Sequence, residues 1–220
     1  MQHTLESPDA GRTPTARRLR RVAMSTVFAR AATDMTHDRE SLEKLGLEHP
    51  DRAPYVASPW WILRWQLPRS QVRPGDVFVD FGCGKGRIVL AAARRYRFAG
   101  VVGVELSDEL SATARTLVDR ERRRLRSEEV RIETTDATEF EVPDAMTHAY
   151  MFNPFLGQTF ERVCANIVAS LDRAPRRLRL IYVQPEEHDA LIATGRFRLE
   201  RAVRVTRLVS PVNVAIYTAR

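Results

Sequence analysis

Three glycines at alternate positions form the part of this chain whose spacing is best suited to ligand chemistry. The segment Val77–Arg87 contains a short apolar run, then Gly82, Gly84 and Gly86, and then the start of an alanine-rich stretch. Glycine tolerates positive φ and has no Cβ, so a ligand can lie directly against peptide groups at a helix N-terminus. We therefore expect a buried strand, a tight loop that holds a nucleoside cofactor, and a helix.

The spacing of these glycines excludes two common nucleotides. A dinucleotide fingerprint needs G-x-G-x-x-G/A, but Arg87 stands where the last small residue should be, which disfavours NAD. A P-loop needs a lysine followed by serine or threonine, whereas Lys85 is followed by Gly86, which excludes ATP bound by that route. The pattern that remains is D-x-G-x-G-x-G, beginning at Asp80.

The next three predicted strands end at groups suited to the same ligand. The Glu105 carboxylate can accept hydrogen bonds from both hydroxyls of a ribose. In an open parallel sheet, ligands bind beyond the carboxyl ends of the strands, so these ends should meet in one crevice. The strand ends are Val101–Leu106 with Glu105, Val130–Thr134 followed by Asp136 and Ala137, and His148–Phe152 followed by Asn153, Pro154 and Phe155.

With these segments the chain resembles the class I S-adenosylmethionine-dependent methyltransferases, in particular a bacterial group with DFGCGKGR-like loops and an NPF segment. The resemblance covers roughly residues 55–220. It implies S-adenosylmethionine as cofactor and S-adenosylhomocysteine as product, with Glu105 at the ribose and Asp136 at the adenine. The cofactor-binding residues that it implies are Asp80, Gly82, Cys83, Gly84, Gly86, Glu105, Leu106, Asp136, Ala137 and Asn153.

The segment Asn153-Pro154-Phe155 carries the inference about the substrate. It resembles the N-P-P-[YFW] motif of methyltransferases that act on planar amino groups, in which the asparagine and a proline carbonyl accept the amine hydrogens and the aromatic ring stacks. This resemblance implies catalytic roles for Asn153, Pro154 and Phe155. The chain has one proline instead of two, so a plain alternative stays open: Asn153 caps a helix that starts near Gly157, and Phe155 packs in the core.

Aromatic residues are concentrated in residues 55–65. Trp61 and Trp65 are four residues apart, so on a helix they would share one face and pack against the sheet. The Tyr55-x-x-Ser58 pattern resembles a segment that precedes the glycine motif in several methyltransferases. That resemblance implies a lid over the cofactor, with Tyr55 as a further catalytic residue; packing alone is the other interpretation.

The rest of the chain alternates predicted strands and helices, which indicates an α/β fold. The resemblance implies a Rossmann-like seven-stranded sheet of order 3-2-1-4-5-7-6 whose last strand is antiparallel. Ser107 is expected to cap the second helix. The expected helices cover residues 87–96, 108–125, 158–171 and 186–193, and the later strands cover 178–183, 198–205 and 213–218.

Residues 1–70 are expected to form an N-terminal helical extension or lid, and residues 71–220 the S-adenosylmethionine-binding methyltransferase domain. Residues 1–14 contain prolines, a glycine and small polar residues, which favours disorder. Helices are expected at Arg17–Thr33 and Ser41–Leu47.

Composition is that of a soluble protein with one sizeable core: 220 residues, of which 44 % are hydrophobic. No apolar run has membrane-spanning length, and no export signal is recognised at the N-terminus. Cys83 and Cys164 lack metal-ligand spacing, so no metal is expected, and reduced thiols favour a cytoplasmic setting.

The net charge of +7 and pI of about 10.1 are compatible with a nucleic-acid partner. However, acids and bases alternate along the predicted helix in residues 115–124, as on a solvated face, and a GC-rich genome favours arginine. Nucleic acid is therefore possible but not favoured. Only residues 17–21 form a dedicated basic cluster.

Three hypotheses for function follow. The leading one is N- or O-methylation of a small molecule, in specialised metabolism. The second is methylation of a protein lysine or a nucleic acid. The third is a cofactor-binding module without catalysis, because the glycine loop, Glu105 and Asp136 argue for binding alone. Oligomeric state is not indicated by the sequence.

Overall fold

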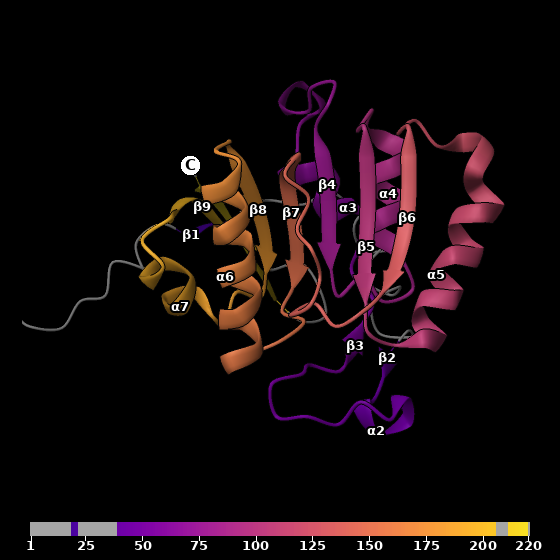
Figure 1. The fold of residues 1–220 in the computed structure, drawn as a ribbon, viewed down its shortest axis with the longest axis horizontal. Helices are drawn as coiled ribbons and strands as arrows, with labels where there is room; N and C mark the ends of the chain where they lie inside the picture. Colours follow the sequence, from indigo (N-terminus) through magenta and orange to yellow (C-terminus); the bar gives the residue numbers. More distant parts are fainter. Residues whose placement is uncertain (1–18, 22–38, 206–210, 220) are drawn as a thin grey trace, which may run out of the picture.

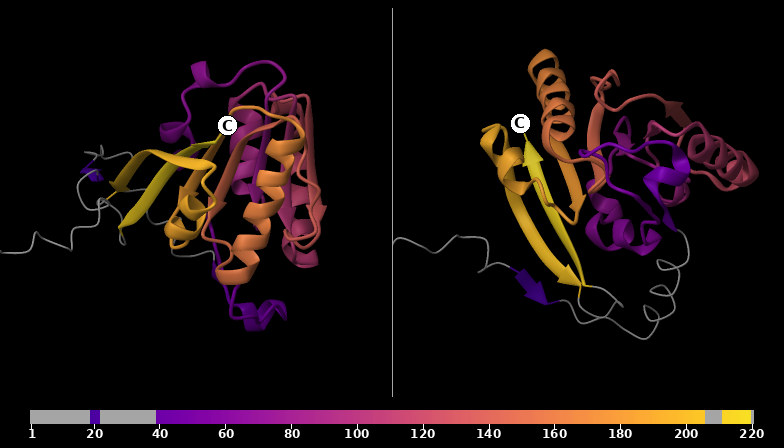
Figure 2. Two further views of the ribbon diagram at one scale, coloured as in Figure 1. Left: turned by 60° about the vertical axis from the view of Figure 1, so that its left-hand side comes forward. Right: turned by 90° about the horizontal axis from the view of Figure 1, so that it is seen from below.

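The computed structural model describes residues 19–21, 39–205 and 211–219. These residues form one mixed sheet with helices on both faces (Figures 1 and 2). The sheet order is β1-β9-β10-β8-β7-β4-β5-β6, and β2 and β3 form a separate pair. The strands are β1 (Leu19–Arg21), β2 (Arg39–Glu40), β3 (Tyr55–Val56), β4 (Val77–Phe81), β5 (Gly100–Glu105), β6 (Glu129–Thr134), β7 (Met146–Phe152), β8 (Leu178–Val183), β9 (Phe197–Val205) and β10 (Val212–Ala219).

The sheet has the expected topology. Strands β4, β5, β6, β7 and β8 pair in parallel, and β10 is antiparallel to both β8 and β9. Numbered without β1, β2 and β3, the order is 3-2-1-4-5-7-6, which confirms the fold class. Strand β4 lies between β5 and β7, so the chain leaves it at the switch point where open α/β sheets bind ligands.

The sheet has an eighth strand, β1, that the sequence did not predict. Leu19–Arg21 pair in parallel with Ala202–Arg204 of β9, so the predicted helix over Arg17–Thr33 is wrong at these three residues. The unpaired edge of β9 offers backbone partners that a sequence pattern does not reveal. The rest of that helix, and the disorder expected for residues 1–14, lie outside the described residues.

The helices lie close to their predicted positions. Ser107 caps α5 as predicted, because its Oγ accepts a hydrogen bond from the Leu110 N–H at 3.3 Å. The helix predicted to reach residue 125 ends at Glu121 and continues as one 3₁₀ turn. The helices are α2 (Leu42–Leu45), α3 (Trp60–Gln66), α4 (Arg87–Arg95), α5 (Asp108–Glu121), α6 (Gly157–Arg173) and α7 (His188–Ala193), with 3₁₀ turns η2 (Arg69–Gln71) and η3 (Arg122–Arg124).

Two hydrophobic clusters cover the two faces of the sheet. Helices α3, α4 and α5 pack on one face, and α6 and α7 pack on the other (Figure 2). Trp61 is buried as expected, but Trp65 is 45 % exposed, so its predicted packing against the sheet is wrong. In the last turn of α3 the inward position belongs to Gln66, whose side-chain oxygen accepts a hydrogen bond from Arg201. Among the described residues, we find no helix with the length and apolar character needed to cross a bilayer.

A buried histidine should make stability depend on pH. His148 lies on β7, with Asp76 at 3.9 Å and the Phe98 ring against it. Burial lowers the pKa of His148 to about 4, although the Asp76 carboxylate acts in the opposite direction. Below pH 6.5 the unfolded chain therefore binds a proton that the folded chain does not. The free energy of unfolding should fall between pH 6.5 and 4, by up to about 3 kcal/mol.

Urea unfolding of the wild type and His148→Gln at pH 7, 5.5 and 4.5 measures this effect. The stability of the variant should depend less steeply on pH in this window, because glutamine does not titrate. Parallel pH profiles for the two proteins would contradict the assignment.

Candidate active site

The glycine loop leaves β4 in a conformation that depends on glycine. Gly82, Gly84 and Gly86 have φ of 74°, 53° and 75°, in the left-handed region that other residues rarely adopt. The N–H groups of Gly82 and Cys83 both donate to the Val104 carbonyl at 2.9 Å. The loop is thereby fixed against the end of β5.

Two of these glycines allow side chains from distant segments to reach the loop. A Cβ on Gly82 would lie 2.5 Å from Cβ of Pro154, and a Cβ on Gly84 would lie 2.2 Å from Cε2 of Tyr55. Both distances are shorter than carbon contacts allow. The fold thus brings Tyr55, the glycine loop and the Asn-Pro-Phe segment together, as the sequence analysis expected.

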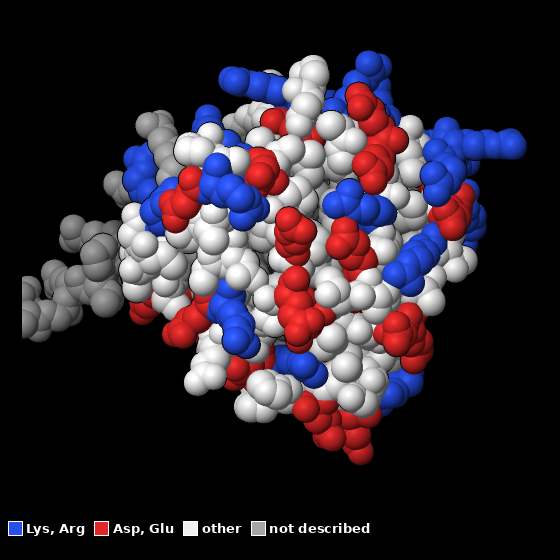
Figure 3. All heavy atoms as spheres, viewed as in Figure 1, with Lys and Arg blue, Asp and Glu red and all other residues white. Residues whose placement is uncertain are grey.

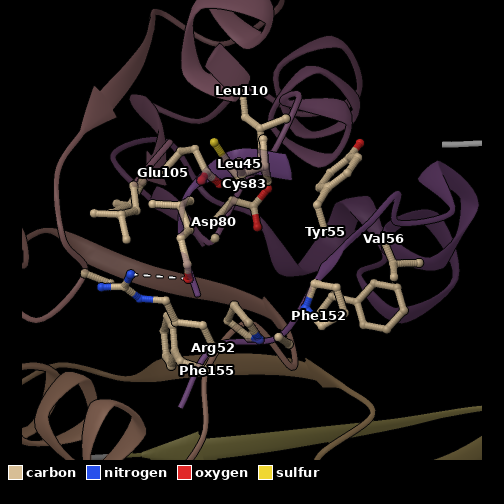
Figure 4. A pocket seen from close by; sticks show the side chains of 18 of the residues that line it. Leu45, Arg52, Tyr55, Val56, Asp80, Cys83, Glu105, Leu110, Phe152 and Phe155 are labelled. Atoms are coloured by element: carbon tan, nitrogen blue, oxygen red, sulfur yellow. Dashed lines mark hydrogen bonds between the residues drawn. The ribbon is translucent and has the colours of Figure 1, made fainter. Parts of the chain in front are cut away.

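A cavity of about 120 Å³ lies at the carboxyl ends of β4, β5 and β7, with Asp80, Glu105, Arg52 and Tyr55 around it (Figure 4). Ten predicted site residues line it: Tyr55, Asp80, Gly82, Cys83, Glu105, Leu106, Asp136, Ala137, Pro154 and Phe155. Gly84, Gly86 and Asn153 are not among the lining residues. Gly86 instead allows α4 to approach α5, because a Cβ there would lie 2.9 Å from Cβ of Ala114.

Asp80 has a buried carboxyl group that lacks a hydrogen-bond donor among the described residues. Its side chain lines the cavity and the residue is 2 % exposed, and no donor within the described part of the chain reaches its oxygens. Burial raises the pKa of Asp80 well above its ordinary value, and the negative charge of Glu105 raises it further. A buried polar group without a hydrogen bond is costly, so this position suits a ligand with a cationic donor.

Glu105 organises the loop and retains capacity for a ligand. Its Oε2 accepts a hydrogen bond from the Gly84 N–H at 2.8 Å, and its Oε1 accepts one from the Ser107 N–H at 2.9 Å. Burial raises the pKa of Glu105, although these two amides act in the opposite direction. Each carboxylate oxygen has a second lone pair, so both can still accept hydrogen bonds from hydroxyl groups in the cavity.

Asp136 is held at the far side of the cavity by hydrogen bonds and by a cation. Its Oδ1 accepts from the Thr138 N–H at 2.8 Å and from the Thr138 hydroxyl at 2.7 Å, and Arg52 lies 3.8 Å from its Oδ2. Partial burial raises the pKa of Asp136, but the Thr138 hydrogen bonds and the Arg52 charge outweigh burial and hold the pKa below its usual value.

Cys83 lines the cavity without the features of a nucleophile. The residue is 7 % exposed and its thiol is free. Burial raises the pKa of the thiol well above its ordinary value, and the charges of Asp80 and Glu105 raise it further. Since the thiolate is the reactive form, Cys83 contributes surface to the site and no covalent chemistry.

The segment before β3 is attached to the Asn-Pro-Phe segment by backbone contacts. Arg52 forms an antiparallel bridge with Phe155. Next to the bridge, the Ala53 N–H donates to the Pro154 carbonyl at 3.2 Å, and the Leu156 N–H donates to the Asp51 carbonyl at 2.8 Å. These contacts hold Arg52 and Ala53 in the lining of the cavity.

Sequence reasoning missed Arg52 and the leucines Leu42, Leu45 and Leu47, which also line the cavity. Leu42 and Leu45 are three residues apart in a short helix, which is a weak signal that one of its faces contacts another element. Arg52 follows no pattern from which its ion pair with Asp136 could have been predicted. At about 120 Å³, the cavity is smaller than the roughly 300–1,000 Å³ of typical ligand pockets.

The packing alternative for the Asn-Pro-Phe segment is wrong for Asn153 and confirmed for Phe155. Asn153 does not cap α6, because the helix begins after Leu156 without a side-chain cap. Its Oδ1 instead accepts a hydrogen bond from the Tyr182 hydroxyl at 3.1 Å, and its φ is 40°. Phe155 is 6 % exposed and packs in the core, as the alternative expected, while it also lines the cavity.

Comparison with known proteins agrees with this geometry. Residues 78–175 match the family model described as "Methyltransferase domain". A protein-lysine N-methyltransferase of Saccharolobus islandicus (strain REY15A) is 36 % identical over 63 residues, which are 29 % of this chain and 39 % of that protein. This chain therefore matches well under half the length of that relative.

Two solved structures show the same fold. One is magnesium protoporphyrin IX methyltransferase (ChlM) from Synechocystis PCC 6803 with bound SAH, with a TM-score of 0.53 and 13 % identity over 72 % of this chain and 80 % of that chain. The other is Streptococcus pneumoniae Sp1610, a proposed tRNA (m1A22) methyltransferase, with a TM-score of 0.52 and 15 % identity over 71 % of this chain and 69 % of that chain.

The sheet order, the family match over residues 78–175 and these structures define a class I methyltransferase fold. S-adenosylmethionine is the cofactor of this class, in agreement with the cofactor that the family resemblance implies.

Proposed function

We propose that this chain transfers the methyl group of S-adenosylmethionine to a nitrogen or oxygen atom of a small-molecule acceptor. The observation that carries this proposal is Asp80, a buried carboxylate without a donor among the described residues, in a cavity that Gly82 of the glycine loop also lines. The ammonium of the cofactor's methionine part is a donor that suits Asp80. Glu105 would accept from the ribose hydroxyls, and Asp136 with Ala137 would hold the adenine.

When bound, S-adenosylmethionine supplies a methyl group already activated by its sulfonium. The protein then has to orient the acceptor and exclude water. Tyr55, Asn153, Pro154 and Phe155 are assigned to this task. The Asn153 side-chain oxygen and the Pro154 carbonyl each accept one hydrogen bond within the protein, which leaves each a lone pair for an acceptor's N–H or O–H.

A small acceptor is supported by the small volume of the cavity, about 120 Å³, which Leu42, Leu45, Leu47 and residues 52–56 help to line. The proposal includes that this small-molecule acceptor belongs to specialised metabolism. The free, buried thiols of Cys83 and Cys164 support a reducing compartment, and a bacterial cytoplasm stays part of the proposal. A protein lysine is the second candidate, on the ground of the partial match to the lysine methyltransferase of Saccharolobus islandicus.

Calorimetry tests the central claim. S-adenosylmethionine and S-adenosylhomocysteine should bind, while NAD and ATP, as controls, should not. If neither S-adenosylmethionine nor S-adenosylhomocysteine bound to the protein, the proposal would be overturned. Release of S-adenosylhomocysteine should then be measured on panels of small amines, small alcohols and lysine peptides. If only the lysine peptides were methylated, the acceptor would be a protein lysine and not a small molecule. If the cofactor bound but no panel were methylated, the chain would be a cofactor-binding module without catalysis.

A further inference from the structure

A basic groove of about 1180 Å³ lies between α3, α4 and α5. Of the sixteen described residues that line it, seven are arginine or lysine and one, Glu109, is acidic. The basic residues come from five parts of the chain: Arg64 of α3, Arg69 of η2, Lys85 of the glycine loop, Arg87, Arg94 and Arg95 of α4, and Arg120 of α5.

This concentration of charge differs from the opposite face of the molecule. Figure 3 shows the face on which α6 lies, where lysine and arginine are interspersed with aspartate and glutamate. The groove is on the other side of the sheet, with α3, α4 and α5. Along single predicted helices arginines and acids alternate, which in the sequence did not favour a nucleic-acid partner. The fold collects the arginines of several elements in one place.

Several of these cations are available to a ligand. Arg64, Arg69 and Arg120 are exposed, and no carboxylate among the described residues forms an ion pair with any of them. Arg94, by contrast, pairs with Glu121 at 3.4 Å. Three unpaired guanidinium groups around one groove favour an anion with charges at several points, because each can hold a separate phosphate.

The groove also offers flat and apolar surface. Trp60 lines it and is 47 % exposed, and Leu63, Leu90 and Ala91 provide further apolar contacts. An exposed indole beside arginines suits a nucleobase, which has a face for stacking and a phosphate on either side. An acidic peptide would satisfy the charges but would leave Trp60 without such a partner. In duplexes the bases are already stacked, so a single strand fits better.

We propose that this groove binds single-stranded nucleic acid, with Arg64, Arg69 and Arg120 on phosphates and Trp60 stacked on a base. Arg87 lines both the groove and the candidate cofactor cavity, so a strand held here would pass close to the methyl-transfer site. The proposal concerns binding and holds whatever acceptor the site methylates.

Fluorescence anisotropy with labelled 12-nucleotide RNA and DNA strands of mixed sequence, without cofactor, tests the proposal. Three phosphate contacts predict that affinity falls by about 20-fold between 50 and 200 mM salt. The triple variant Arg64→Ala/Arg69→Ala/Arg120→Ala should remove most of this salt dependence. Trp60→Ala should weaken binding by about 5- to 150-fold and leave the salt dependence unchanged. A comparison of the RNA and DNA strands shows which of the two is preferred.

A matched control is the triple variant Arg122→Ala/Arg123→Ala/Arg124→Ala. It removes the same number of charges from η3, which does not line the groove, and should retain wild-type affinity. Thermal unfolding checks that both triple variants fold. Three results would overturn the proposal: no binding at 50 mM salt, equal loss in both triple variants, or tight binding of a polyglutamate peptide that the oligonucleotide does not displace. Binding of S-adenosylmethionine is measured separately by calorimetry, so failure of the groove proposal can be distinguished from failure of the proposed cofactor site.

Discussion

Replacement of Glu105 by alanine should weaken S-adenosylmethionine binding by roughly 10- to 150-fold, or about 1.4–3 kcal/mol. The variant loses the acceptors proposed for the ribose hydroxyls. It also leaves the N–H groups of Gly84 and Ser107 without the carboxylate oxygens that now lie 2.8 and 2.9 Å away. The free energy of unfolding should therefore fall by about 1–3 kcal/mol as well. Calorimetry measures the first effect and urea unfolding the second.

Glu105→Gln separates the two parts of this effect. Glutamine keeps one acceptor oxygen and nearly the same shape, so its losses of affinity and stability should be intermediate. Unchanged affinity in Glu105→Ala would remove Glu105 from the cofactor site. Reduced stability with unchanged affinity would show that Glu105 stabilises the glycine loop and does not bind the cofactor.

The parts of the fold that the sequence predicted are those set by local patterns. Strand β4 could be placed because its residues are apolar on both faces, with Phe78 in one hydrophobic cluster and Val79 in the other. The loop could be placed because three alternate positions need positive φ. The strand order came from resemblance to a family, since a chain of alternating strands and helices can be arranged in several orders.

The parts that were missed depend on contacts between distant residues. The ion pair of Arg52 with Asp136 joins positions that carry no shared pattern, and the pairing of β1 depends on the free edge of β9. The basic groove is of the same kind. In the sequence, Arg64 and Arg120 are two ordinary helix residues, and only the packing of α3, α4 and α5 places them around one groove.

Asp80→Asn should have opposite effects on stability and binding. In the folded protein without ligand, burial raises the pKa of Asp80 and the charge of Glu105 raises it further, because both destabilise the ionised carboxylate. An uncharged amide removes that penalty and should raise the melting temperature at pH 7.5 by about 2–4 °C, the shift that 1 kcal/mol produces in a chain of this size. Affinity for S-adenosylmethionine should fall by roughly 10- to 150-fold, because a hydrogen bond between charged groups is lost.

The sign of the stability effect also depends on pH. A raised pKa in the folded state means that the folded chain binds the proton more tightly, so stability is lost as pH rises above the unfolded value near 3.8. The gain in Asp80→Asn should therefore shrink as the pH falls toward 3.8, because the carboxyl is protonated in both states only below that value. Scanning calorimetry at pH 7.5 and 4.5 measures the difference.

Methylthioadenosine provides the ligand control for Asp80→Asn, because it keeps the adenine and ribose but lacks the ammonium of methionine. Its affinity should be the same for the wild type and the variant. An equal loss for both ligands would mean that Asp80 shapes the glycine loop and does not contact the ammonium. A lower melting temperature at pH 7.5 would mean that the carboxylate stabilises the fold, in which case it is no longer the unpartnered group on which the assignment of the cofactor site depends.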